Sequence, residues 1–323
     1  MIPTLGTRAL VAIVGPTAVG KTALALQVAE DLPVEVISAD SRQVYRFMDI
    51  GTAKPTVLDR QRVPHHLIDV VAPDEPFSLA QYQELAQSAI DRVHARGHIP
   101  LLVGGTGLYI RSVLQGLTIP HVEPDRQLRE HMMAEAEAHG CGALHQRLRI
   151  LDPVAAQRID PRNVRRVIRA LEVCSRSGQP ISSLQRTSPP PYPTLCIGLT
   201  MPRPQLYARI DQRVQRMVAA GWIDEVRSLV AGGYDYSLPA MSGLGYREIG
   251  MHLRGEVSLQ EAMARTRWRT HRFVRQQATW FRSDDAAIAW FDAGGAVAEA
   301  VVARVRAFLA QVEATPAASQ CSA

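Results

Sequence analysis

The chain has 323 residues, 46% of them hydrophobic, which is enough for one large domain or two modest ones with a core. No apolar run reaches membrane-spanning length and the N-terminal MIPTLGTRAL lacks the core of a signal peptide, so we expect a cytoplasmic protein without a membrane partner. The net charge of +5 permits a nucleic-acid partner without requiring one. Cys141, Cys174, Cys196 and Cys321 form no Cys-x-x-Cys pair, which argues against a structural zinc site or a disulfide framework.

The first predicted element is a buried strand over residues 9–14, and helical spacing begins at Thr22. Gly15 and Gly20, between them, let backbone N–H groups curl around an anion at the positive end of the helix. Lys21 adds a full charge, and the Thr22 hydroxyl is placed to hold Mg²⁺. The pattern predicts a P-loop for a di- or triphosphate, made of Gly15, Pro16, Thr17, Ala18, Val19, Gly20, Lys21 and Thr22.

A second strand is predicted over residues 34–38, and Asp40 follows it. Because ligands gather at the carboxyl ends of strands in an open parallel sheet, Asp40 should share a rim with the P-loop. A carboxylate there could accept a proton, bind Mg²⁺ or cap the next helix.

A short third strand is predicted over residues 64–69, ending in an acid. His65 and His66 would point to opposite faces and make a poor metal pair. Asp69 is a candidate Walker B acid on Mg²⁺, as an ATPase or nucleotide kinase would need.

After a helix over residues 79–95, the strand at 99–103 opens into Gly104 and Gly105, where a Walker B motif would supply an acid. The glycines permit close backbone approach to a ligand, or they form a tight turn from strand to helix. Thr106 would aim its hydroxyl at the site that faces Asp40.

Alternation of strands and helices then stops between the proline-bearing segments 118–124 and 188–193, and helical periodicity takes over. We therefore expect an α/β fold, a P-loop NTPase-like parallel sheet flanked by helices, with an inserted all-helical domain. The expected boundaries are 1–118 and 194–313 for the catalytic core, 119–193 for the insertion and 314–323 for a disordered tail. The insertion carries an arginine stripe, which is a solvated face or a phosphate-backbone footprint; its members are Arg162, Arg165, Arg166, Arg169 and Arg176.

A strand at 195–200 resumes the sheet, and a helix over 205–220 follows. Arg209, Arg213 and Arg227 are candidates to reach over a bound phosphate, since a guanidinium can grip two oxygens at once. Residues 265–282 hold six arginines interleaved with aromatic side chains, which suits stacking on unpaired bases as well as phosphate contact.

Together these stretches resemble the bacterial tRNA dimethylallyltransferase (tRNA isopentenyltransferase) family over almost the whole chain. The matching stretches are GPTAVGKT, SADSRQVYR with MDIGTAKP, PHHLIDV, PLLVGGTGLY, RRVIRALEV, RIDQRV, GWIDEVRSL, GLGYREI and QATWFR. The chain departs at Arg275 and Gln276, where the family usually has Lys-Arg before a Gln, and at Arg162 and Asn163, where it often has Asn-Asp.

The resemblance implies transfer of a dimethylallyl group from dimethylallyl diphosphate to the N6 amine of the adenine beside the tRNA anticodon, by a monomeric enzyme. Its P-loop would hold the diphosphate with Mg²⁺ on Thr22, and Arg227 would add a second cation. Asp40 would be the general base and Thr106 would orient the amine. The implied tRNA contacts are Asp40, Ser41, Arg42, Gln43, Thr106, Arg129, Arg165, Arg166, Val167, Ile168, Arg169, Ser242, Gly243, Leu244, Gly245, Tyr246 and Arg247.

Without the resemblance, the P-loop alone favours a small-molecule or nucleoside kinase that uses ATP. The glycines after Val103 and the arginine-striped insertion argue against a kinase. A third hypothesis is an RNA chaperone that binds phosphate and catalyses no reaction. The placement of Asp40 and Thr106 at the edge of the sheet beside the P-loop argues against it.

Overall fold

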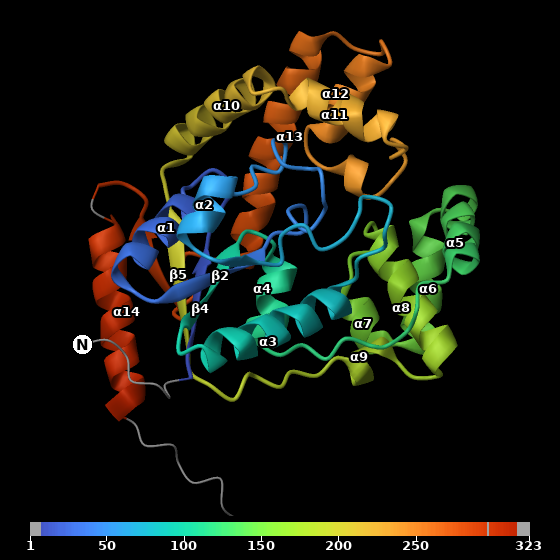
Figure 1. The fold of residues 1–323 in the computed structure, drawn as a ribbon. Helices are drawn as coiled ribbons and strands as arrows, with labels where there is room; N and C mark the ends of the chain where they lie inside the picture. The colour runs from blue at the N-terminus through green and yellow to red at the C-terminus, as the bar shows by residue number, and fades with distance from the viewer. Residues whose placement is uncertain (1–7, 296, 315–323) are drawn as a thin grey trace, which may run out of the picture. The chain divides into compact units, whose positions relative to one another are not determined.

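The computed structural model describes residues 8–295 and 297–314 and divides into two compact units (Figure 1). The larger unit combines the chain up to Leu114 with the chain from Pro191 onward, and the smaller unit is Gln115–Pro190. The smaller unit therefore begins and ends a few residues before the expected 119–193. The tail expected at 314–323 lies outside the described residues except for Ala314, which ends the last helix.

The larger unit is built on a six-stranded sheet with the order β3-β2-β4-β1-β5-β6, and all its strand pairs are parallel. Parallel order places the carboxyl ends of the strands at one edge, where ligands bind in open α/β sheets. The strands are β1 (Leu10–Val14), β2 (Val34–Ala39), β3 (His65–His66), β4 (Ile99–Gly104), β5 (Thr194–Thr200) and β6 (Ile288–Asp292).

Helices cover both faces of the sheet, so its strands are buried on both sides. Val11 and Ile13 of β1 pack into one core with α1 (Lys21–Asp31) and α14 (Val297–Ala314). Alternate residues of the same strand, Leu10 and Ala12, pack into a second core with α3 (Leu79–Ala95) and α4 (Gly107–Leu114). Because alternate residues of β1 face two different apolar cores, its sequence is one continuous apolar run.

The predicted third strand is mostly wrong, because only His65 and His66 pair with β2. Leu67 and Asp69 have positive φ angles of 63° and 58°, which take the chain out of extended conformation. Sequence analysis did not anticipate β6, which is short and only half-buried. A short helix, α2 (Val57–Arg62), precedes β3.

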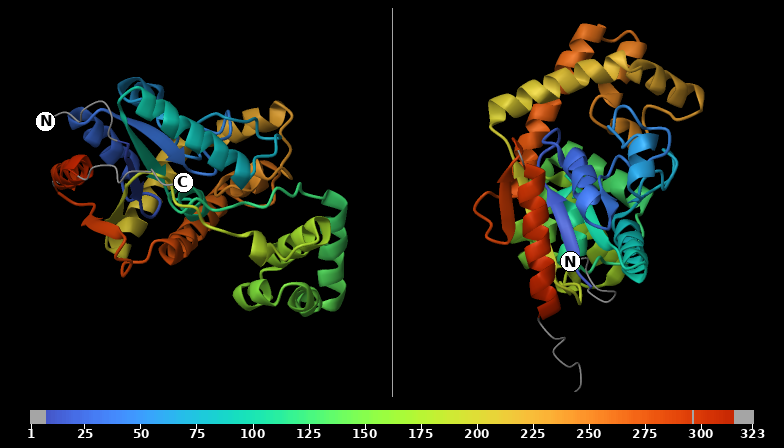
Figure 2. Two further views of the ribbon diagram at one scale, coloured as in Figure 1. Left: turned by 90° about the horizontal axis from the view of Figure 1, so that it is seen from below. Right: turned by 60° about the vertical axis from the view of Figure 1, so that its left-hand side comes forward.

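Four helices of the larger unit, α10 to α13, lie beyond the carboxyl ends of the strands (Figures 1 and 2). The 22-residue α13 contacts both α10 and α12, and its Val274 packs into the core formed with β1, so α13 joins this group to the sheet. The helices are α10 (Arg203–Ala219), α11 (Trp222–Ala231), the 3₁₀ turn η1 (Ala240–Ser242), α12 (Tyr246–Leu253) and α13 (Leu259–Trp280).

The smaller unit is helical, with a core of its own around Met132, Leu148 and Leu171. Its helices are α5 (Arg126–His139), α6 (Cys141–Leu151), α7 (Pro153–Arg158), α8 (Val164–Ser177) and α9 (Ile181–Leu184). Across the described residues, no helix combines the length and hydropathy needed to cross a bilayer. Cys141, Cys174 and Cys196 are free, and Cys321 lies outside the described part of the chain.

Candidate active site

Two adjoining cavities open in the larger unit at the carboxyl ends of the strands. The first, of about 330 Å³, is lined by the P-loop, the end of β4 and α10, and we call it the P-loop cavity. The second, of about 300 Å³, is lined by the loop between β4 and α4, the loop before α12 and one face of α13, and we call it the Thr106 cavity. The residues that line both are Thr17, Ala18, Lys21, Asp40, Thr52 and Arg213.

The P-loop conformation depends on left-handed backbone at particular positions. Gly15 has φ 144°, and a Cβ there would lie 2.6 Å from the Leu199 carbonyl oxygen, so this position accepts only glycine. Ala18 and Gly20 also have positive φ, and α1 then begins at Lys21 with no side chain capping its first turn. Uncapped N–H groups at a helix N-terminus are an anion-binding site.

Lys21 folds back onto its own loop, donating to the carbonyl oxygens of Gly15 at 3.0 Å and Pro16 at 2.7 Å. Burial lowers the pKa of Lys21 to about 8, against the opposing attraction of Asp40, and Arg213 adds to the lowering. An incoming anion would offer the ammonium a better partner than the two carbonyls. Thr22, the next residue, also lines the P-loop cavity.

Asp40 follows β2 and stands where the two cavities meet. Its Oδ1 accepts the N–H of Arg42 at 2.8 Å, so the carboxylate shapes the turn that follows it. The next helix, α2, begins at Val57, so Asp40 does not cap a helix. Thr106 lines the second cavity, and its Oγ1 accepts the N–H of Ser41 at 3.0 Å. The loops that follow β2 and β4 are therefore hydrogen-bonded to each other. Asp40 and Thr106 lie on these loops, at the same edge of the sheet.

The expected role of Arg227 as a phosphate-gripping cation is wrong. Its side chain is 61% exposed, pairs with Asp224 and lines neither cavity. In α11 the adjacent Val226 points into the core, which turns Arg227 toward solvent. The arginines that do line the P-loop cavity come from α10, at i, i+4 and i+7: Arg209, Arg213 and Arg216. Burial lowers the pKa of Arg213 from its usual value, against the attraction of Asp40.

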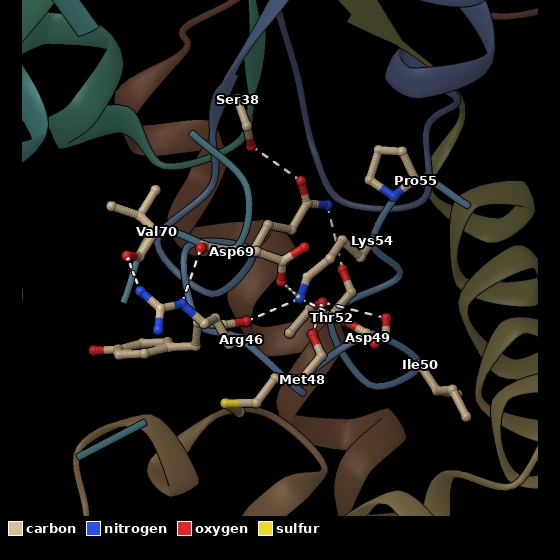
Figure 3. Close-up of polar contacts among 12 residues, drawn as sticks. Ser38, Arg46, Met48, Asp49, Ile50, Thr52, Lys54, Pro55, Asp69 and Val70 are labelled. Atoms are coloured by element: carbon tan, nitrogen blue, oxygen red, sulfur yellow. Dashed lines mark hydrogen bonds and ion pairs between the residues drawn. The ribbon is translucent and has the colours of Figure 1, made fainter. Parts of the chain in front are cut away.

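Asp69 is not a Walker B acid, because it lines neither cavity and is fully engaged elsewhere (Figure 3). It accepts hydrogen bonds from Lys54 Nζ at 2.6 Å and Arg60 Nη1 at 2.7 Å. Burial opposes ionisation, but these donors hold the pKa of Asp69 below its usual value. Lys54 also contacts Asp49 and the Tyr45 carbonyl oxygen, so this network fixes the loop that forms one wall of the P-loop cavity.

Most of the predicted tRNA contacts in the larger unit surround the Thr106 cavity; these are Ser41, Arg42, Ser242, Gly243, Leu244 and Tyr246. Arg247 is exposed, while Gly245 is buried and lines neither cavity. Gln43 lines the P-loop cavity instead, and its amide oxygen already accepts a hydrogen bond from Ser38 Oγ at 3.0 Å. The Thr106 cavity also has apolar lining residues on α10 and α13, namely Ile210, Val214, Met217 and Phe273.

In the smaller unit, Val167 and Ile168 are at most 3% exposed, so their side chains are buried, and RNA contact by the 165–169 segment stays a prediction. They form the apolar face of α8. Arg129 of α5 and Arg169 of α8 both bind the buried Glu172 carboxylate, with contacts of 2.6 to 2.8 Å, and the Arg129 contact holds α5 to α8. Arg165 and Arg166 are exposed and remain candidates for RNA contact.

Sequence analysis missed Glu225, whose carboxylate accepts the backbone N–H groups of Asp49, Ile50 and Gly51 at 2.6 to 3.1 Å. It also accepts the Tyr246 hydroxyl at 2.6 Å. Glu225 thereby fixes two segments that line the Thr106 cavity. The only signal for it was its place in the GWIDEVRSL stretch, where its function could not be distinguished from that of a surface acid. The described residues hold no cluster of three or more side chains suited to a metal ion.

Comparison with known proteins identifies the family of the chain. Residues 43–284 match the sequence model of the IPP transferase family, and residues 8–69 match that of isopentenyl transferases. The chain is 55% identical to a tRNA dimethylallyltransferase of Roseiflexus sp. (strain RS-1), over 84% of this chain and 90% of the relative.

Solved structures give the same result. The full-length tRNA isopentenylpyrophosphate transferase of Bacillus halodurans is 41% identical with a TM-score of 0.71, covering 95% of this chain and 98% of that one. A eukaryotic dimethylallyltransferase described as acting on tRNA is 25% identical with a TM-score of 0.77, covering 97% and 82%. The match to the IPP transferase model covers most of the chain, and the listed relatives align over most of their own length. This chain therefore belongs to the tRNA dimethylallyltransferase family.

Proposed function

We propose that this enzyme transfers the dimethylallyl group of dimethylallyl diphosphate to the N6 amine of the adenine beside a tRNA anticodon, releasing diphosphate. The observation that carries the proposal is the position of Asp40, between the P-loop cavity and a cavity that combines Thr106 and apolar side chains with Arg42 and Arg269. A nucleophile and a leaving group would meet from opposite sides at this carboxylate.

The P-loop cavity binds the diphosphate. Amide groups at the start of α1 and the ammonium of Lys21 face one side, and the guanidinium of Arg213 faces another. Negative charge grows on the bridging oxygen as the allylic C–O bond breaks, and fixed cations stabilise that charge most in the transition state. Arg213 takes the role that the sequence had suggested for Arg227.

Mg²⁺ suits this cavity, because the protein offers hard oxygen ligands and few of them. The Thr22 hydroxyl would hold the ion together with diphosphate oxygens and water, as is common for Mg²⁺ in phosphate sites. When bound, the ion would offset charge on the leaving group.

The Thr106 cavity takes the flipped-out adenine and the five-carbon chain. The Thr106 hydroxyl oxygen lies beside the Ser41 backbone and can accept from the N6 amine, while the wall of Val214, Met217 and Phe273 packs on apolar groups. Asp40 takes one N6 proton as the new C–N bond forms and the C–O bond breaks. A base must leave its stack to reach such a site, which fits an unpaired loop nucleotide.

The arginines Arg165 and Arg166 of the smaller unit contribute phosphate contacts to the anticodon stem-loop. One chain supplies the lining of both cavities, so we propose that the enzyme works as a monomer in the cytoplasm. Sedimentation of the free enzyme and of its 1:1 mixture with tRNA tests the first point, since a dimer would contradict it.

The test of function is incubation with labelled dimethylallyl diphosphate and an unmodified tRNA transcript, followed by nucleoside digestion. Label on adenosine N6 is expected, and a transcript with guanosine at the target position is the control. The kinase alternative has lost its candidate acid, since Asp69 is bound to Lys54 and Arg60. Phosphoryl transfer from ATP without any prenyl transfer would overturn the proposal.

A further inference from the structure

Gln277, on the last turns of α13, lies with both ends of its side-chain amide hydrogen-bonded. Its Oε1 accepts the N–H of Thr17 in the P-loop at 2.9 Å, and its Nε2 donates to the carbonyl oxygen of Gly105 at 3.0 Å. The residue is 3% exposed and lines the Thr106 cavity. A carboxamide is suited to this place because it carries an acceptor and a donor side by side.

The two loops that Gln277 joins have no backbone pairing of their own at this point. Strands β1 and β4 pair up to Val14 and Gly104, and beyond that the P-loop and the Gly105 loop continue separately. The side-chain amide of Gln277 supplies one further hydrogen-bonded link between the two loops. A Cβ at Gly105 would lie 2.3 Å from Nε2, so the missing side chain is what admits the amide.

In the proposed reaction, the two loops contact different reactants. Thr17 belongs to the P-loop, whose following residues hold the leaving group, and Gly105 precedes Thr106, which faces the nucleobase. The Thr106 N–H donates to the Ala39 carbonyl oxygen at 3.2 Å and its Oγ1 accepts from Ser41, so the Gly105 loop is also tied to both neighbours of Asp40. A shift between the loops would change the distance from amine to allylic carbon.

We propose that Gln277 is a positioning residue that sets the distance between the diphosphate cradle and the nucleobase side of the site. It contacts neither the diphosphate amides of α1 nor Asp40, so it acts through the two loops. An error of about 1 Å in the alignment of two reactants can cost on the order of a hundredfold in rate, whereas binding of each alone need not change. The inference rests on the proposed roles of Asp40 and Thr106.

The test uses the full-length enzyme with three variants: Gln277→Glu, Gln277→Met and the control Gln260→Glu. Gln260 is an exposed residue in the first turn of α13, so it receives the same chemical change away from the site. We would measure single-turnover prenyl transfer at saturating substrates from pH 6 to pH 9, and the dissociation constants of tRNA and dimethylallyl diphosphate. Thermal unfolding gives the folded fraction, to which rates are normalised.

In the Gln277→Glu variant, the ionised carboxylate keeps the acceptor for Thr17 but has no donor for Gly105, and the protonated carboxyl group recovers that donor. At pH 8 we expect the Gln277→Glu rate to fall at least about tenfold, with each dissociation constant within about threefold of wild type. Relative to wild type, this rate should recover toward pH 6, because burial raises the pKa of a carboxyl group. The Gln277→Met rate should fall with a flat relative pH profile, and Gln260→Glu should match wild type.

Rates of both Gln277 variants within about twofold of wild type would overturn the inference, as would a loss confined to substrate affinity. A purely structural role would lower the unfolding temperature of Gln277→Glu without a pH-dependent recovery of its rate, which also overturns it. If Gln277→Met does not fold, the pH profile of Gln277→Glu still decides. Absence of transfer by wild type and Gln260→Glu would instead contradict the proposed function.

Discussion

Replacing Arg213 with alanine should remove most of the activity, whereas replacing Arg227 should remove almost none. Arg213 lines both cavities and is largely withdrawn from water, as the lowered pKa of its guanidinium reflects. Removal of one fixed donor to a developing negative charge costs about 3–4 kcal/mol, or roughly 10²–10³ in rate. Arg227 is 61% exposed and pairs with Asp224, and an exposed pair of this kind contributes about 0–1 kcal/mol.

The assay is steady-state transfer of labelled prenyl group to tRNA, with kcat and KM determined for both substrates. We expect Arg213→Ala to lower kcat and kcat/KM together, because the contact forms in the transition state. The kcat of Arg213→Lys should lie between those of wild type and Arg213→Ala, since lysine keeps the charge but cannot bind two oxygens in bidentate fashion. A severe loss in Arg227→Ala with a mild one in Arg213→Ala would refute the assignment.

Three further outcomes follow from the site and the smaller unit. Asp40→Asn should lower turnover by about 10²–10⁴-fold while tRNA affinity survives, and equal loss of both would make Asp40 a recognition residue. The pKa of Lys21 is about 8 in the free enzyme, and its charged form binds diphosphate. Affinity for dimethylallyl diphosphate, measured by calorimetry, should therefore weaken about tenfold from pH 7 to pH 9. An affinity that does not change with pH would contradict a charged Lys21 contact. Replacing Arg165 and Arg166 should reduce the salt dependence of tRNA binding and leave the unfolding temperature unchanged. Arg169→Ala should lower the unfolding temperature, because Glu172 loses a partner. A lower unfolding temperature for the Arg165 and Arg166 variants, with a weaker salt dependence only for Arg169→Ala, would contradict both assignments.

The parts of the site that sequence predicted are those set by local chain order. The P-loop is a strand, a glycine turn and a helix in direct succession, so its anion-binding geometry is determined within about ten residues. Asp40 and Thr106 each follow a buried parallel strand, and parallel strands bring their carboxyl ends to one edge. The helical insertion could likewise be recognised from its bounding prolines and its 3.6-residue period.

The parts that sequence left open depend on which way an element faces. Helical spacing shows that α10 and α11 have two faces, but only their packing decides that Arg213 turns to the cavity and Arg227 to solvent. The sequence alone allows the Asp69 carboxylate to hold a metal ion, but in the structure it pairs with Lys54 and Arg60, both earlier in the chain.

The sequence by itself determined the fold class, the anion cradle and the acid at the strand end, because each is encoded by neighbouring residues. Tertiary structure alone decided which arginine lines the P-loop cavity, the burial of Val167 and Ile168, and the bridge made by Gln277 to Thr17. That bridge joins residues 260 positions apart. Contacts between distant segments depend on how whole elements pack, and no local pattern specifies that packing.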